Sequence, residues 1–265
     1  MEDQPRNSAG AEESSVLLDR AGEVATITLN RPESLNAIDE KMMAQLNSAL
    51  LTAGDDEQCA VIVLTANGRA FCTGKDMKAG LDNRSMERKL RRSRTVFNAV
   101  RTMRDVPQPV IAAVQGYAVG AGFALAVASD LRIVGPDAKF KAVFAEVGMT
   151  PGDLGLSYFL PRIIGAGRAA QLFYRAGTID AQQAQDWGLA AEIASDPRIR
   201  AHELARELAE LPSESLRQTK ELLETSASAS TYRDHLLLEL RSQVICAETN
   251  SHHEAMATFV QRRSR

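Results

Sequence analysis

The chain has few of the residues that mark several specialised classes of protein. Of its 265 residues, 5% are aromatic, three are cysteines and four are histidines. Cys59, Cys72 and Cys246 are odd in number and lack the spacing of metal ligands, which disfavours a disulfide framework and fits the reducing cytoplasm. An excess of one charge is also absent, since 31 basic and 34 acidic residues give a net charge of −3. No global basic field is therefore expected to recruit nucleic acid or an anionic membrane.

Targeting segments and common catalytic motifs are missing too. The first residues are polar and acidic and lack the apolar core of a signal peptide, so residues 1–14 are expected to form a disordered tail. The chain has no G-x-S-x-G elbow, no H-E-x-x-H pair and no phosphate-binding loop of the G-x-x-x-x-G-K-[ST] type. Serine hydrolase, zinc protease and P-loop chemistries are thereby disfavoured.

One uncharged run, residues 110–128, is long enough to raise the question of a transmembrane helix. Gln115-Gly116 interrupts the run, and Gly120 and Gly122 follow within the same stretch. Glycines at these places are typical of turns, so the run is predicted to form a buried strand, a turn and a buried helix.

Strand and helix patterns alternate over the first half of the chain. Asp39 is predicted to cap a helix whose apolar positions recur at helical spacing up to Ala53. A second, basic helix is expected to point Leu90, Phe97, Val100 and Met103 inward. Alternation of this kind predicts a largely parallel sheet in an α/β core at residues 15–200, followed by a helical region at residues 201–265. The predicted strands are residues 24–29, 60–64, 110–114 and 131–134, and the later helices are 85–104, 120–129, 168–174, 180–188, 199–211, 213–225 and 231–263.

Two turns rich in small residues stand out as candidates for chemistry. They are Ala70-Phe-Cys-Thr-Gly-Lys-Asp-Met77 and Gly116-Tyr-Ala-Val-Gly-Ala-Gly122. Backbone N–H groups exposed by such turns can converge on one developing negative charge, especially where a helix begins. Taken alone, glycine-rich turns of this kind are also common packing features.

At these turns the chain resembles the crotonase, or enoyl-CoA hydratase/isomerase, family. The resemblance spans about residues 24–195, and its stretches occur in family order. It implies an α/β fold, the crotonase superhelix of ββα units, with a helical C-terminal region that forms a homotrimer or a dimer of trimers. The stretches that carry it are residues 27–37, 70–78, 109–122, 128–132, 160–165 and 184–189.

The resemblance also implies an acyl-CoA substrate, as in fatty acid metabolism, and no separate cofactor, since coenzyme A is part of the substrate. The thioester oxygen would lie between the N–H groups of Lys75 and Ala121, where an enolate carries its charge. Proline could replace neither residue, since it has no N–H group. The substrate would contact Ala37, Ala70, Asp76, Met77 and Lys78, while Phe123 and Phe144 would form an apolar wall for the acyl group.

The sequence departs from the hydratases of this family at both glutamates that activate and deliver water. The matching positions are Ala124 and Phe144, neither of which can move a proton. Asp153 is the best replacement, because it precedes Arg162 by the nine residues that separate a functional aspartate from the matching arginine in other family branches. Glu146 is a second candidate. Isomerisation, which needs one such group, is therefore favoured over hydration.

Several alternatives stay open. Asp153 could cap the following helix, or act as the nucleophile in dehalogenase-like or hydrolase-like chemistry, or the chain could bind acyl-CoA without catalysis. The excess of basic residues between Arg84 and Arg104 could meet the phosphates of coenzyme A, or form a solvated helix or a subunit interface. It could also bind RNA, although the acidic balance of the chain makes nucleic acid an unfavoured partner. No membrane partner is expected.

Overall fold

The described residues, 14–76, 85–229 and 231–263 of the computed structural model, form two β-sheets. In the larger sheet β1 pairs antiparallel with β2, and all other neighbours are parallel. The largely parallel sheet predicted from the alternating pattern is thereby confirmed. The expected tail lies outside the described residues, except for Ser14. In sheet order, the strands are β1 (Val16–Ala21), β2 (Val24–Leu29), β3 (Val61–Ala66), β4 (Val110–Val114), β6 (Leu131–Val134) and β9 (Glu192–Ile193).

The smaller sheet has the order β5-β7-β8 and begins where β4 ends. Its strands are β5 (Tyr117–Val119), β7 (Lys139–Lys141) and β8 (Thr178–Asp180). A tight turn joins β4 to β5 at Gly116, which has φ +56°, and a Cβ atom there would lie 2.1 Å from the carbonyl oxygen of Arg69. The uncharged run 110–128 therefore folds as a strand, a turn, a short second strand and a helix, which confirms the prediction and adds β5.

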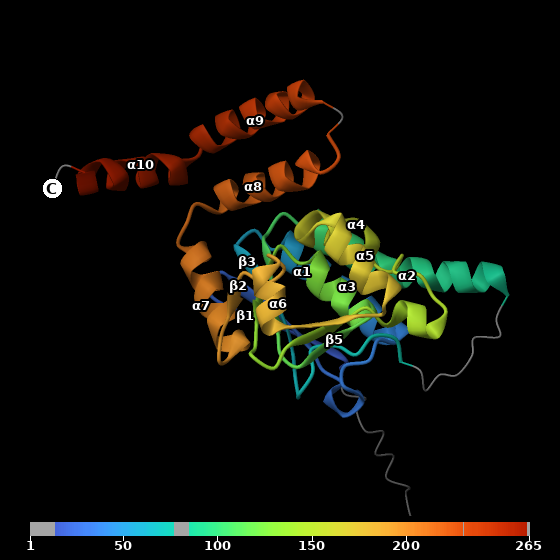
Figure 1. The fold of residues 1–265 in the computed structure, drawn as a ribbon. Coiled ribbons are helices and arrows are strands. Elements are labelled where there is room, and N and C mark those ends of the chain that lie inside the picture. The colour runs from blue at the N-terminus through green and yellow to red at the C-terminus, as the bar shows by residue number, and fades with distance from the viewer. Residues whose placement is uncertain (1–13, 77–84, 230, 264–265) are drawn as a thin grey trace, which may run out of the picture.

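Helices cover both faces of the larger sheet (Figure 1). Strand β3 is buried along its whole length, because Ile62 and Leu64 face one apolar cluster and Val61 and Val63 face the other. This arrangement explains its continuous apolar run. The helices are α1 (Glu40–Asp55), α2 (Met86–Asp105), α3 (Ala121–Ala128), α4 (Leu156–Ile164), α5 (Ala166–Tyr174), α6 (Ala181–Asp186), α7 (Pro197–Ala209), α8 (Ser213–Ser226), α9 (Tyr232–Ala247) and α10 (Asn250–Arg263), with the 3₁₀ helices η1 (Pro32–Ser34) and η3 (Val143–Val147).

Helix α7 belongs to the packed body. Its Ala201 and Ala205 are fully buried in the cluster that contains Val61 and Val63 of β3. The expected boundary between residues 200 and 201 falls inside this helix. Helices α8, α9 and α10 follow it, and α8 lies between the body and α9 (Figure 1). Within the described residues, none of the helices combines the length and the apolar character that a membrane crossing requires.

Two helical expectations were wrong in detail. The pattern predicted over residues 231–263 is divided into α9 and α10, because the Thr249 hydroxyl accepts a hydrogen bond from the His252 amide at 3.1 Å and starts a new helix. In α2, Val100 and Met103 are buried as predicted, but Leu90 and Phe97 are 57% and 43% exposed. The N-terminal half of α2 projects beyond the body, so these side chains find no core to enter (Figure 1).

Candidate active site

The first element of the site is the turn at residues 72–76, beyond the end of β3. Its start is bound to β5, since the Cys72 amide donates to Tyr117 and the Val119 amide donates to Cys72, at 3.0 and 2.9 Å. Burial raises the pKa of the Cys72 thiol to about 12, so this side chain stays neutral and only packs.

Further along this turn, Lys75 forms a parallel bridge with Ile38. In that bridge the Ile38 amide donates to Gly74 at 2.7 Å, and the Asp76 amide donates to Ile38 at 2.9 Å. The two hydrogen bonds use the residues on either side of Lys75 and leave its own N–H directed away from Ile38.

The second element is the N-terminus of α3. Gly120 precedes the helix at φ +53°, and its amide donates to the Lys141 carbonyl at 3.0 Å. Ala121 is the first helical residue, so its N–H has no acceptor within the helix and lies at the positive end of the helix dipole. Within the described part of the chain, neither the Lys75 amide nor the Ala121 amide has a hydrogen-bond acceptor.

The two elements are in direct contact. A Cβ atom on Gly74 would lie 2.7 Å from the Val119 carbonyl oxygen and 3.6 Å from the Ala121 amide nitrogen. A Cβ atom on Gly122 would lie 2.1 Å from the Cys72 carbonyl oxygen. Only glycine allows this approach, which brings the residue before Lys75 against the start of α3. The arrangement can offer two amides to one small anion.

Asp153 lies in the loop between η3 and α4. Gly155 is the N-cap residue of α4, and no side chain caps this helix. The Asp153 backbone carbonyl accepts a hydrogen bond from the Leu156 amide at 2.9 Å. The interpretation that the Asp153 side chain caps this helix is therefore wrong. Leu154 and Gly155 both have positive φ, and buried Leu154 anchors the loop.

The Asp153 carboxyl group is half-buried. Burial raises its pKa above the ordinary aspartate value. The positive charge of Lys75 lowers this pKa, but by less than burial raises it. The effect of Lys75 on this pKa is an electrostatic interaction between Asp153 and the turn at residues 72–76. Considering the described residues alone, its carboxylate has no hydrogen-bond or ion-pair partner.

The other acidic candidate has a different setting. Glu146 lies on η3, is half exposed and forms an ion pair with Lys141 at 3.0 Å. A surface ion pair of this kind contributes little to stability, and here Lys141 already binds the Glu146 carboxylate. Of the two acidic candidates, Asp153 is the one with an unpartnered, partly desolvated carboxyl group.

Apolar side chains occupy the two positions that the family resemblance matches to glutamates. Ala124 is fully buried in α3, and Phe144 is 6% exposed. A Cβ atom on Gly120 would lie 3.9 Å from Cζ of Phe144, so this ring borders the start of α3. Phe123 instead packs against Phe140 with ring centroids 5.2 Å apart, in the core.

The remaining predicted substrate contacts flank the turn at residues 72–76. Ala37 and Ala70 are buried, and Asp76 forms an ion pair with Arg31 at 3.0 Å. Met77 and Lys78 lie outside the described residues. Sequence reasoning missed Arg31 as a site residue, although it lies inside one of the stretches that carry the family resemblance.

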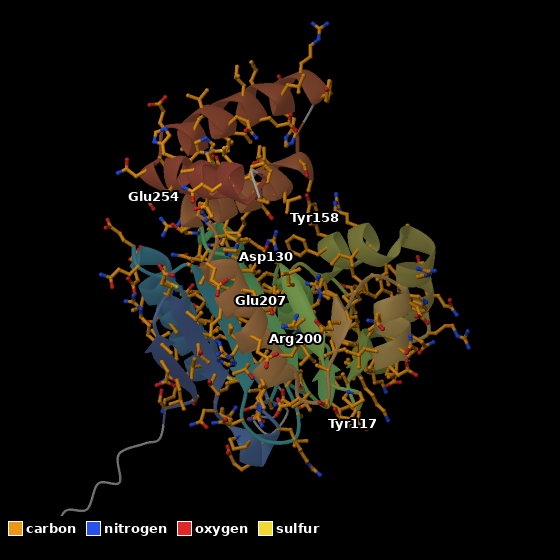
Figure 2. The ribbon with its side chains drawn as sticks, turned by 90° about the vertical axis from the view of Figure 1, so that its left-hand side faces the viewer. Tyr117, Asp130, Tyr158, Arg200, Glu207 and Glu254 are labelled. Atoms are coloured by element: carbon orange, nitrogen blue, oxygen red, sulfur yellow. The ribbon has the colours of Figure 1, made fainter. Side chains whose placement is uncertain are left out.

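The basic residues of α2 divide into two groups. Arg104 donates to the Ala128 carbonyl and pairs with Asp130 and Glu224. Asp130 follows the C-terminus of α3 and lies toward the C-terminal helices, whereas Tyr117 on β5, which leads into the N-terminus of α3, lies far from them (Figure 2). Arg104 therefore acts at the opposite end of α3 from Ala121. The other described basic side chains of α2, Arg88, Lys89, Arg91, Arg94 and Arg101, are exposed.

No metal site accompanies these groups. Over the ranges that the structure describes, no cluster of three or more His, Cys, Asp or Glu side chains is arranged to hold a metal ion.

The fold and the pair of adjoining turns define a protein of the crotonase class. A family model described as enoyl-CoA hydratase/isomerase matches residues 19–265, so the chain belongs to this enzyme family. It is 35% identical over 246 residues to 1,2-epoxyphenylacetyl-CoA isomerase from Escherichia coli, which covers 91% of this chain and 93% of the relative. It is also 39% identical over 218 residues to probable enoyl-CoA hydratase EchA14 from Mycobacterium tuberculosis, covering 80% and 82%.

Solved structures agree with the assignment. The crystal structure of an enoyl-CoA hydratase from Polaromonas sp. JS666 superposes with a TM-score of 0.88 at 29% identity and covers 93% of this chain and 97% of its own. Enoyl-CoA hydratase from Bacillus anthracis gives a TM-score of 0.88 at 27% identity, with 94% and 96% covered. The predicted family and fold are confirmed.

Proposed function

We propose that this enzyme moves a carbon–carbon double bond within an acyl-CoA thioester, with Asp153 as the group that takes up and returns the proton. The observation that carries the proposal is the half-buried Asp153 carboxyl group, which has a raised pKa and no partner among the described residues. Double-bond migration needs one such group. Hydration by two glutamates needs two, and Ala124 and Phe144 supply neither.

The proposed reaction begins with the thioester oxygen between the Lys75 and Ala121 amides. Ionised Asp153 removes a proton from the carbon next to the thioester carbonyl of a β,γ-unsaturated substrate. The electron pair moves into the carbonyl group, so negative charge develops on the oxygen that faces the two N–H donors. The protonated Asp153 then returns the proton to the γ carbon, and the double bond becomes conjugated with the thioester. No water is consumed.

The substrate class that we propose is an apolar or aromatic acyl group on coenzyme A, which is itself part of the substrate. The Phe144 ring beside Gly120 supports this choice, because it offers an apolar surface next to the proposed position of the reacting carbons. The name of the E. coli relative, an isomerase of 1,2-epoxyphenylacetyl-CoA, also supports isomerase chemistry on an acyl-CoA.

We also propose that the protein assembles as a homotrimer or a dimer of trimers through its C-terminal helices. Leu237, Leu240 and Val244 on α9 are 69%, 63% and 54% exposed in the single chain. Such apolar side chains on one helix support a contact between subunits. Sedimentation velocity would measure the assembly.

The experiment for the reaction supplies pairs of enoyl-CoA thioesters that differ only in double-bond position, and follows products by chromatography and mass. We expect interconversion without a change in mass. Asp153→Asn should lower turnover on the order of 10²–10⁴-fold, because proton transfer is lost, while acyl-CoA binding stays within about threefold. Asp105→Asn is the control, since Asp105 is exposed and forms an ion pair with Arg101 on α2.

Three outcomes would contradict the proposal. A product heavier by one water would assign hydration, and a covalent adduct on Asp153 would assign nucleophilic catalysis. Tight binding without turnover across a panel of acyl groups would make the chain an acyl-CoA-binding module.

A further inference from the structure

Arg31 connects three segments of the site through one side chain. The Arg31 side chain is 19% exposed. Nη1 donates to the Ala37 carbonyl at 2.5 Å and lies 3.2 Å from the Asp39 carboxylate. Nη2 donates to the Asp76 carboxylate at 3.0 Å. One planar group thus joins the loop before α1, the N-terminal cap of α1 and the residue that follows Lys75.

The loop that carries Arg31 is itself held in place. The Asn36 side chain accepts a hydrogen bond from the Arg31 amide at 2.8 Å and donates to the carbonyls of Asn67 and Ala70 at 2.8 and 2.9 Å. Asn36 is fully buried and has φ +55°. Because these hydrogen bonds fix the loop, the Arg31 guanidinium has a defined position and can orient the groups that it binds.

The partners of Arg31 flank the Lys75 amide. Ala37 precedes Ile38, whose backbone binds Gly74 and Asp76 at 2.7 and 2.9 Å. The guanidinium binds Ala37 on one side of this bridge and the Asp76 side chain on the other. Rotation of the peptide between Gly74 and Lys75 would break the hydrogen bond from the Ile38 amide to the Gly74 carbonyl. The guanidinium holds the Ala37–Ile38 peptide that makes this bond, and it holds the Asp76 side chain, so it restrains the direction of the Lys75 N–H.

Charge adds a second effect. The Asp76 side chain is 15% exposed and follows directly after the amide that is proposed to bind the thioester oxygen. A carboxylate there would oppose the negative charge that develops on that oxygen, and the opposition is strong where water is scarce. The Arg31 guanidinium offsets this charge through its ion pair with Asp76.

We propose that Arg31 is a positioning residue for the oxyanion hole: it orients the Lys75 amide and neutralises Asp76 without touching the substrate. The proposal rests on the proposed function. It requires the guanidinium fork, because the two Nη atoms bind acceptors on different segments, and a lysine ammonium is a single point donor.

The test measures the thioester carbonyl stretch of a bound, unreactive acyl-CoA that carries a ¹³C label at this carbon. Hydrogen bonds to the oxygen lower this frequency. We expect a shift to lower frequency in the wild type, a smaller shift in Arg31→Gln, and an intermediate one in Arg31→Lys. In Arg31→Gln, kcat should fall about 10- to 100-fold, less than the loss expected from removing a donor completely. The dissociation constant of the acyl-CoA should change less than threefold.

Arg20→Gln is the matched control. Arg20 also pairs with an aspartate, Asp56 at 2.5 Å, but on the surface and away from the site. Its carbonyl shift and kcat should equal those of the wild type. An unchanged shift and kcat in Arg31→Gln would overturn the role of Arg31. If Arg31→Gln does not fold, an unchanged shift and kcat in Arg31→Lys would overturn it. Absence of the shift in the wild type would instead overturn the proposed oxyanion hole.

Discussion

The two halves of the proposed site are built in different ways. The half that contains the amides consists of residues 31–38, 72–76 and 116–122, which exchange backbone hydrogen bonds across segments distant in sequence. The half that contains Asp153 is a single loop. Residues 145–150, at the end of η3 and the start of that loop, are exposed, and the hydrogen bonds from the Gly148, Met149, Gly152 and Leu156 amides all reach acceptors within five residues.

This difference means that, in the proposed site, the amides are constant whereas the acid–base group can be exchanged. The amides belong to the main chain, so almost any side chain at Lys75 or Ala121 preserves them. The proposed proton-transferring group, Asp153, is a side chain on a loop, where substitution costs the fold little. In the proposed site, the same framework can therefore keep its amides while the acid–base group changes, and the family resemblance matches Ala124 and Phe144 to glutamate positions.

Within the amide half, the largest expected effect comes from removing one amide and keeping the fold. Proline suits the first position of a helix, as Pro197 does at the start of α7, but it has no N–H group. Ala121→Pro should lower kcat on the order of 10²–10³-fold, the loss typical of one oxyanion-hole donor. Steady-state kinetics with a thermal unfolding curve would measure both activity and fold.

A matched control exists on α5. Ala166 is also the first residue of its helix and also follows a glycine with positive φ, Gly165, but it is exposed and outside the site. Ala166→Pro should keep full activity. If Ala121→Pro is active while folded, the amide half of the site does not stabilise the reaction, and the comparison between the two halves fails.

Much of the fold could be predicted because local patterns and packing agree. Asp39 accepts a hydrogen bond from the Met42 amide at 2.7 Å, as its position before a helical pattern predicted. The apolar positions that recur at helical spacing up to Ala53 are buried in α1, namely Met42, Met43, Leu46, Ala49, Leu50 and Ala53. Strands of two or three residues, such as β5 and β9, carry too short a pattern to be recognised. Their positions depend on the neighbours to which they bind.

The site was less accessible to sequence reasoning, for a physical reason. An N–H group is common to nearly every residue, so Lys75 and Ala121 could be selected only through the family resemblance. Arg31 in Asn30-Arg31-Pro32 has the local pattern of a turn, and its role depends on contacts with residues up to 45 positions away. Asp153 was also selected through the family resemblance, by its spacing from Arg162, and only the structure excludes a capping role.

The second prediction concerns the electrostatic link between the two halves. The proposed reaction requires ionised Asp153, so kcat/KM should fall as the pH decreases through the raised pKa of this group. The positive charge of Lys75 lowers that pKa. Lys75→Met keeps the amide and removes the charge, so the acidic limb of the pH profile should move to higher pH while the plateau changes little. Lys139→Met, on β7, is the control, and a limb that does not move would mean that the two halves are electrostatically independent.

The smallest expected effect is on stability, and it tests whether the loop is held by its own carboxylate. Burial raises the pKa of Asp153, so the folded state binds its proton more tightly than the unfolded state and the ionised group opposes folding at neutral pH. Asp153→Asn should therefore unfold at the same or a higher temperature than the wild type at pH 7. The difference should shrink as the pH falls through the pKa of Asp153 in the folded state, and it should vanish below the pKa of this group in the unfolded chain, where the wild type is neutral in both states. Calorimetry at several pH values would measure it, with Asp105→Asn as the exposed control. A lower unfolding temperature for Asp153→Asn at pH 7 would show that the carboxylate stabilises its loop, and that the acid–base half is held as firmly as the amide half.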